Sequence, residues 1–204
     1  MKKSLLIMLA SIFFTTFAFA GGDQNQNRYD GVIGEGPTQQ RRIAEPNKDA
    51  LQVSQLDESQ KNIIYSIYEE EKVARDVYIT LGEIYPEENT FANIQLAEQT
   101  HMDAVRNLCV KYGIEIPDVD QDVGVFHLEE MELLYNGFVD DELTSLILAL
   151  EAGKAIEERD MADLAEALLL DLPKDVEKVF TNLMRGSTYH LEAFIQALDR
   201  ETLP

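Results

Sequence analysis

Apolar residues recur three or four positions apart through four long segments of this chain, and that spacing restricts the fold more than any other feature. It places the apolar side chains on one face of an α-helix. The pattern predicts long helices at about residues 56–84, 90–113, 141–168 and 174–198. No segment of any length alternates apolar and polar residues with the period of two that a half-buried strand requires. The sequence therefore predicts an all-α fold.

The connections between these segments indicate how the helices pack. Pro86 and the polar residues after it make a short turn, so the first two helices form a hairpin, with Thr90 expected to cap the second. A long connection follows at residues 114–126, and then a short helix in LEEMELLYNGF that Gly137 is expected to end. Residues 171–173 break the chain before the last helix. Four long helices of comparable length with one irregular crossover predict a four-helix bundle.

Residues 1–20 have the form of a secretory signal peptide, with two lysines, a short apolar run and small residues before an expected cleavage after Ala20. The run is too short to span a membrane comfortably, so no membrane attachment is expected after cleavage. We expect residues 21–53 to be a flexible polar leader, because few of them can fill a core, and residues 54–204 to form the helical domain. The mature protein is expected in the periplasm or outside the cell.

The charge of the chain limits its partners. Acidic residues outnumber basic ones 38 to 17, which gives a formal net charge of −21. Such a field repels nucleic acid and anionic lipid, whereas it suits cations. The single cysteine, Cys109, can form no intramolecular disulfide, so we expect stability to come from core packing and Cys109 to take part in it.

Polar residues stand at positions of the first two long helices where the helical period requires apolar ones. Glu71 lies four residues after Ile67 and shares its inward face, whereas Glu69 and Lys72 are expected to point away. In the second helix, Glu98 and His101 are three residues apart and follow the apolar stripe of that helix. A Glu-x-x-His pair on a buried face is a metal-binding pair.

The last two long helices repeat this anomaly. Glu157 and Asp160 share a face with Leu164, and Ser187 and His190 share a face of the final helix. Isolated buried charges are costly unless they are paired or bind a cation. Carboxylates can bridge two cations, and a neutral imidazole suits iron, manganese, zinc or copper. Four helices that each contribute to one face therefore predict a metal site.

Each residue also has a structural interpretation. Glu71 could pair with Arg75 one turn later, which is a common ion pair of helices. Either His101 or His190, taken alone, could be an ordinary histidine hydrogen-bonded to a neighbour. We expect His127 to lie at the start of a helix and not to be a ligand.

Four segments carry a resemblance to a known family: YEEEKVARDVY, FANIQLAEQTHMDAV, IEERDMADL and NLMRGSTYHLEAF. Through them, residues 54–200 resemble the bacterial and archaeal family catalogued as domain of unknown function 2202, within the ferritin-like superfamily. The resemblance implies a ferritin-like four-helix bundle with a long crossover connection and a short extra helix. More remotely, the run from Glu71 to Arg75 and the pair Glu98-x-x-His101 look like the first two ligand helices of rubrerythrin-type proteins.

The resemblance also implies one or two bound iron or manganese ions, with zinc as a further option. The implied ligands are Glu71, Glu98, His101, Glu157, Asp160 and His190. The chain departs from the superfamily in the final helix, where Ser187 replaces the glutamate of a second Glu-x-x-His motif. One carboxylate is lost, so either Asp160 or water would complete the second metal, or only one site would fill.

Three functions are compatible with these residues. The resemblance implies a metal-dependent redox protein that reacts with dioxygen or peroxide, in which Tyr68 or Tyr78 would donate a hydrogen bond or an electron. The chain lacks the paired cysteines of a rubredoxin module, so an electron donor would be a separate molecule. The alternatives are metal sequestration without turnover and a metal-free structural or interaction bundle. The sequence leaves open whether the protein forms a homo-oligomer.

Overall fold

The computed structural model describes residues 56–117, 122–140 and 144–202. They form five helices: α1 (Glu58–Ile84), α2 (Asn89–Tyr112), α3 (Glu129–Phe138), α4 (Leu146–Ala167) and α5 (Lys174–Thr202). These residues contain no strand, so the predicted all-α fold is confirmed for them. The signal peptide and leader predicted for residues 1–53 lie outside the described residues.

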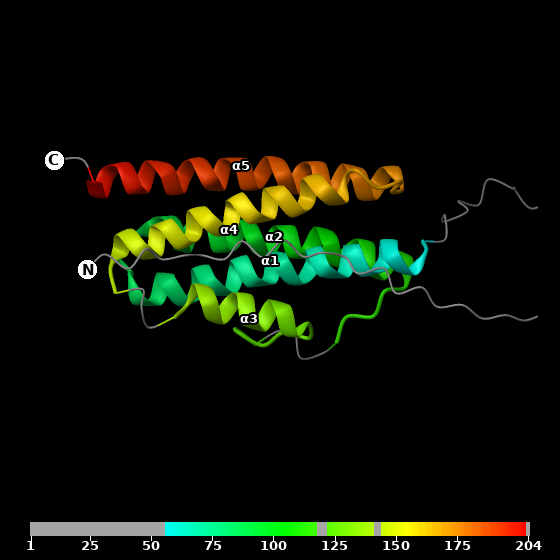
Figure 1. Cartoon of the computed structure of the whole chain (residues 1–204), viewed down its shortest axis with the longest axis horizontal. Coiled ribbons are helices and arrows are strands. Elements are labelled where there is room, and N and C mark those ends of the chain that lie inside the picture. Colours follow the sequence, from blue (N-terminus) through cyan, green and yellow to red (C-terminus); the bar gives the residue numbers. More distant parts are fainter. Residues whose placement is uncertain (1–55, 118–121, 141–143, 203–204) are drawn as a thin grey trace, which may run out of the picture. The chain divides into compact units, whose positions relative to one another are not determined.

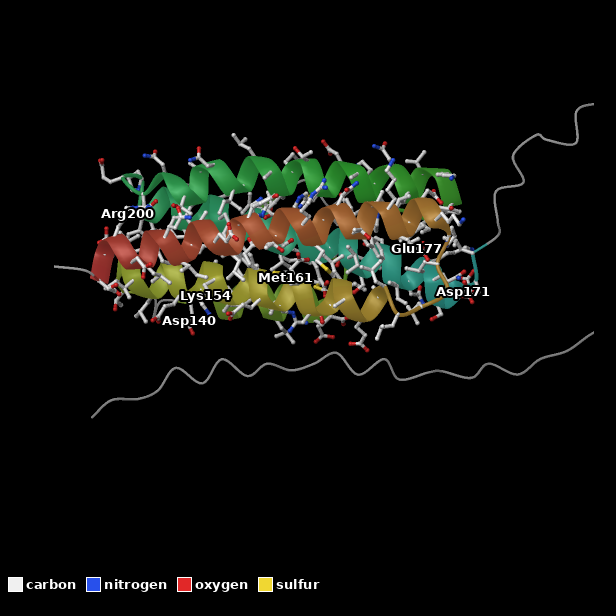
Figure 2. The ribbon with its side chains drawn as sticks, turned by 90° about the horizontal axis from the view of Figure 1, so that it is seen from above. Asp140, Lys154, Met161, Asp171, Glu177 and Arg200 are labelled. Carbon is white, nitrogen blue, oxygen red and sulfur yellow. The ribbon has the colours of Figure 1, made fainter. Side chains whose placement is uncertain are left out.

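The four long helices lie side by side, and each runs opposite to the neighbours it packs against (Figure 1). The helices α1 and α2 form one hairpin and α4 and α5 a second, with α1 against α4 and α2 against α5. Because α2 and α4 run in the same direction, the chain must return along the helices between them, and α3 lies in this return, against α1. In Figure 2, Asp171 marks the turn from α4 to α5, and Arg200 lies at the opposite end.

Capping groups set the ends of the first hairpin. The helix α1 begins in a capping box, in which Gln60 N donates to Asp57 Oδ1 at 2.8 Å and Asp57 N donates to Gln60 Oε1 at 2.9 Å. The helix α2 begins one residue before Thr90, because the carboxylate of Glu88 is the cap and accepts from Thr90 N at 2.9 Å. The prediction of Thr90 as the cap is therefore wrong. The helix α2 ends at Tyr112, and the predicted Gly113 is its C-cap, in the left-handed conformation with φ of 66°.

The later helix ends differ from the predictions in two places. The helix α3 passes through Gly137 and ends at Phe138, so the predicted end at Gly137 is wrong. The helix α4 follows its N-cap Ser145, whose Oγ accepts from Leu148 N at 3.3 Å. The predicted start near residue 141 lies outside the described residues. No helix in the described part of the chain is both long enough and apolar enough to cross a membrane.

Two groups of apolar side chains pack between the long helices, one on each side of the region around residue 71. One cluster of buried apolar residues draws on all four, and it includes Tyr68 and the fully buried Cys109, so the predicted packing role of Cys109 is confirmed. Tyr78, Phe91 and Phe194 form a separate aromatic group with ring centroids 5.1 to 6.4 Å apart. Along α1, residue 71 falls between Tyr68 of the first group and Tyr78 of the second.

The outer face of α1 is also buried, so Glu69 and Lys72, which were predicted to point away from the inward face, lie against the crossover. Both side chains are fully buried, because the crossover covers this face. The Glu69 carboxylate accepts from the backbone N–H groups of His127 at 2.9 Å and Leu128 at 2.7 Å. Lys72 donates to Asp76 at 2.5 Å and to a crossover carbonyl at 2.8 Å. Buried charges therefore fasten the crossover to α1.

Candidate metal centre

The structure brings the six predicted ligand residues into one region between the four long helices. All are buried or nearly so: Glu71 from α1, Glu98 and His101 from α2, Glu157 and Asp160 from α4, and His190 from α5. Figure 2 labels Lys154 and Met161 on α4, and the two α4 carboxyl residues lie on the helix between them. Residues from two separate hairpins thus converge on one interior site.

His101 joins the α1 and α2 carboxylates. Its Nδ1 lies 3.1 Å from Glu71 Oε2 and 2.9 Å from Glu98 Oε2. The alternative pairing of Glu71 with Arg75 is wrong, because Arg75 donates to its neighbour Asp76 at 2.7 and 2.8 Å and to a glutamine of α2. Glu71 is thus directed to the interior and not to a surface ion pair.

His190 makes the matching contact on the other hairpin. Its Nδ1 lies 2.7 Å from Glu98 Oε1 and 3.6 Å from Glu157 Oε2. The shorter contact is an ion pair between the Glu98 carboxylate and a protonated His190. The carboxylate of Glu98 therefore lies between two imidazoles, one at each oxygen. Ligand atoms of Glu98, His101 and His190 all lie within 4.8 Å of one another, an arrangement that could hold a metal ion.

Hydroxyl groups orient the two α4 carboxyl groups. Tyr78 donates to Glu157 Oε1 at 2.6 Å, which agrees with the predicted hydrogen bond from Tyr78 to the site. Ser187 donates to Asp160 Oδ2 at 2.5 Å. Ser187 stands where the resemblance implied a glutamate of a second Glu-x-x-His motif. Its hydroxyl group binds the carboxyl group of Asp160 instead. Tyr68 instead accepts a short hydrogen bond from a guanidinium of α2.

Gly186 lets α5 approach the ring of His101. A Cβ atom at this position would lie 2.4 Å from His101 Nε2 and 2.6 Å from its Cε1. Any side chain at residue 186 would therefore displace the ring. The close packing against Nε2 leaves Nδ1 as the nitrogen that faces the carboxylates of Glu71 and Glu98.

Several polar atoms of the site have no hydrogen-bond partner among the described residues. They are Glu71 Oε1 and Asp160 Oδ1, whereas Glu98 Oε1 and His190 Nδ1, which make no hydrogen bond either, lie 2.7 Å apart as an ion pair. Buried polar atoms are nearly always partnered, so a group of exceptions in one place requires an explanation. Carboxylate oxygens and an imidazole nitrogen are the donors that divalent transition metals take in proteins. The residues present therefore fit a bound metal.

The charges of the site are strongly coupled. Burial disfavours a charged His101, but hydrogen bonds to Glu71 and Glu98 outweigh it and raise the pKa of His101 to about 11. In the same way, Glu157 and Glu98 raise the pKa of His190 to about 9 against the effect of burial. Burial acts to raise the pKa of Glu98, but its contacts with both histidines lower it to about 2. Glu98 is therefore an anion between two cations.

The remaining carboxyl groups resist ionisation. Burial and then the charge of Glu98 raise the pKa of Glu157 to about 8. Burial raises the pKa of Asp160 to about 7, although the hydrogen bond from Ser187 opposes the shift. Burial and the charge of Asp160 hold the pKa of Glu71 well above its usual value. These shifts express burial first and then the nearby carboxylate charge, and a metal cation would offset both.

Three further polar residues, missed in the sequence analysis, lie beside the predicted set. Glu70 of α1 is buried, and the pKa of its carboxyl group is raised well above the usual value by burial and by Asp163 and Asp160. Arg159 Nε lies 3.3 Å from Asp163 Oδ2. Asp163 lies three residues after Asp160, and this spacing was a signal in the sequence for Asp163. Nothing in the sequence pairs Asp163 with Glu70.

The chain matches the family described as uncharacterized protein domain DUF2202 over residues 60–203. The uncharacterized protein MJ0754 of Methanocaldococcus jannaschii is 40% identical over 144 residues, which are 71% of this chain and 77% of that protein. The crystal structure of hypothetical protein MJ0754 from Methanococcus jannaschii matches this structure with a TM-score of 0.69 at 39% identity, over 72% of this chain and 83% of that chain. The family predicted from the four segments is confirmed, and this chain belongs to the DUF2202 family.

Proposed function

We propose that this protein is a ferritin-like metal-binding protein that holds two iron or manganese ions and carries out oxidase- or peroxidase-type redox chemistry. One observation carries the proposal: the buried carboxylate of Glu98 has His101 at one oxygen and His190 at the other, at 2.9 and 2.7 Å. Two imidazoles on opposite sides of one carboxylate suit two cations that share a bridging ligand. The antiparallel packing and the long return between α2 and α4 support a four-helix bundle of the ferritin type.

The remaining ligands divide between the two positions. Glu71 and His101 would hold one ion, Glu157 and His190 the other, and Glu98 would bridge them. Asp160, oriented by Ser187, supplies a further carboxylate near the centre, where a second bridging glutamate is missing. Zinc fits the same donors, and metal supply decides among such ions as much as ligand type does.

The bound ions would supply the electron-transfer chemistry with dioxygen or peroxide. The chain itself would orient the ligands and control protons around them. Tyr78 keeps its hydroxyl proton and donates it in a hydrogen bond to Glu157. Burial and the charge of Glu157 keep the pKa of this phenol well above its usual value. Electrons would come from a separate donor, since the one cysteine of the chain rules out a rubredoxin module within it. Export to the periplasm or outside the cell, as residues 1–20 predict, is part of the proposal.

The test is anaerobic loading with Fe(II), followed by metal analysis and then by exposure to oxygen or peroxide under optical observation. Wild type is expected to bind iron near stoichiometrically and to show new absorption on oxidation. The His101→Ala variant should lose the bound iron. The matched control is His127→Ala, because His127 is the one histidine outside the site, is exposed, and should leave iron binding unchanged.

The outcomes separate the three candidate functions. Iron that binds tightly in wild type without any oxidation would favour sequestration over redox chemistry. Iron content at background in wild type, equal to that of His101→Ala, would rule out both redox chemistry and metal sequestration. The buried polar groups would then serve structure alone.

A further inference from the structure

A row of carboxyl groups leads along α4 away from the candidate metal centre. Glu157, Asp160 and Asp163 follow one another at intervals of three residues, a spacing that keeps them on one side of the helix. The first two are buried, whereas the side chain of Asp163 keeps 22% of its exposure. The row therefore runs from the centre to the protein surface.

Glu70 of α1 faces the outer half of this row. Its residue is only 8% exposed, and its carboxyl group lies within hydrogen-bonding reach of Asp163. The helices α1 and α4 pack against each other, and after burial the charges of Asp163 and Asp160 both raise the pKa of Glu70. The charge of Asp160 also acts on the neighbouring Glu71, which contacts His101. The carboxyl groups thus form a continuous series from the surface to a histidine of the centre.

Four oxygens of this series are buried and have no hydrogen-bond partner within the described part of the chain. They are Glu70 Oε2, Glu71 Oε1, Asp160 Oδ1 and Asp163 Oδ2. A buried polar atom without a partner is costly. Because these oxygens lie next to the candidate metal centre, a metal ion would be a suitable partner for them. At the outer end, Arg159 Nε lies 3.3 Å from Asp163 Oδ2, so a guanidinium occupies the place that an arriving cation would take.

We propose that Asp163, Glu70 and Asp160 form the path by which divalent metal ions pass between the surface and the candidate centre. The inference rests on the function proposed above. Hard divalent cations take carboxylate oxygens as ligands, so such a cation can pass from one carboxylate to the next. Burial raises the pKa of Glu70 and Asp160, and an arriving cation favours the ionised form of these carboxyl groups, whose oxygens then bind it. Glu70 and Asp163 therefore set the rate of metal uptake and leave its final amount unchanged.

The experiment follows Co²⁺ uptake by the metal-free protein in a stopped-flow spectrometer, with Co²⁺ as an optical probe. The variants Glu70→Gln and Asp163→Asn should slow uptake on the order of tenfold or more. Their Co²⁺ content at equilibrium should equal that of wild type. The control is Glu158→Gln, which makes the same substitution at an exposed residue of α4 that pairs with Lys154, and its uptake rate should stay within about twofold of wild type.

Equal uptake rates in wild type and in both path variants would overturn the inference. A lower Co²⁺ content at equilibrium would overturn it too, because Glu70 and Asp163 would then be ligands. Wild type that takes up no Co²⁺ would overturn the proposed function as well, so the two failures are distinguishable. Thermal melting followed by circular dichroism checks that each variant is folded. If Glu70→Gln impairs folding, Asp163→Asn still tests the path, because Asp163 is partly exposed.

Discussion

Replacing Gly186 with alanine tests whether the fit between α5 and the His101 ring holds the candidate centre in place. Inside a helix this change normally stabilises a protein by about 0.5–1 kcal/mol. Here the new Cβ would lie 2.4 Å from His101 Nε2, so the ring must move. The movement overpacks the interior and weakens the contacts with Glu71 and Glu98, at a combined cost of about 2–4 kcal/mol. We expect the free energy of unfolding to fall by about 1–3 kcal/mol.

Urea unfolding of the metal-free protein, followed by circular dichroism, measures this change. The control is Gly137→Ala in α3, where an added Cβ meets nothing within 4 Å and should stabilise by about 0.5–1 kcal/mol. In a His101→Ala background the clash is removed, so Gly186→Ala should stabilise there as well. If Gly186→Ala stabilised the otherwise wild-type protein as much as Gly137→Ala does, the reasoning would be refuted.

Three further predictions concern the interior. Tyr78→Phe leaves Glu157 Oε1 without its 2.6 Å donor, so urea unfolding should show a loss of about 1–3 kcal/mol, and an unchanged value would contradict the contact. Burial raises the pKa of Cys109 to about 12, so a thiol reagent should label native protein far more slowly than protein in urea. Metal must displace protons from His101 and His190, whose pKa values of about 11 and 9 keep them protonated near neutrality. Co²⁺ affinity should therefore rise with pH, about tenfold per pH unit for each proton displaced, and a flat profile would refute this.

Local periodicity was sufficient to predict the helices and the inward direction of the site residues. Glu71, Glu98 and His101 interrupt apolar stripes, and a residue on such a stripe faces the interior whatever the partner helix is. The serine at residue 187, where the resemblance implied a glutamate, was also visible in the sequence. What Ser187 binds was not, because its partner Asp160 belongs to another helix.

The misses share a physical cause, which is packing between segments distant in the sequence. Glu69 and Lys72 are polar and lie off the apolar stripe, so a single helix gives no reason to bury them. The docked crossover covers them and supplies backbone partners to both, in addition to those within α1. Glu70 likewise becomes part of the site only when Asp163 of α4 lies beside it. The role of Gly186 depends on a ring that belongs to α2.

The burial of α1 on both sides limits where this scaffold accepts redesign. Every residue from Ile67 to Tyr78 is buried, so over three turns α1 offers no position that can change without a partner elsewhere. The outer faces of α2 and α5 are different, since Leu96 and Tyr189 are largely exposed. An engineer who wishes to attach a label, a tether or a new binding surface should therefore choose α2 or α5 and leave α1 intact.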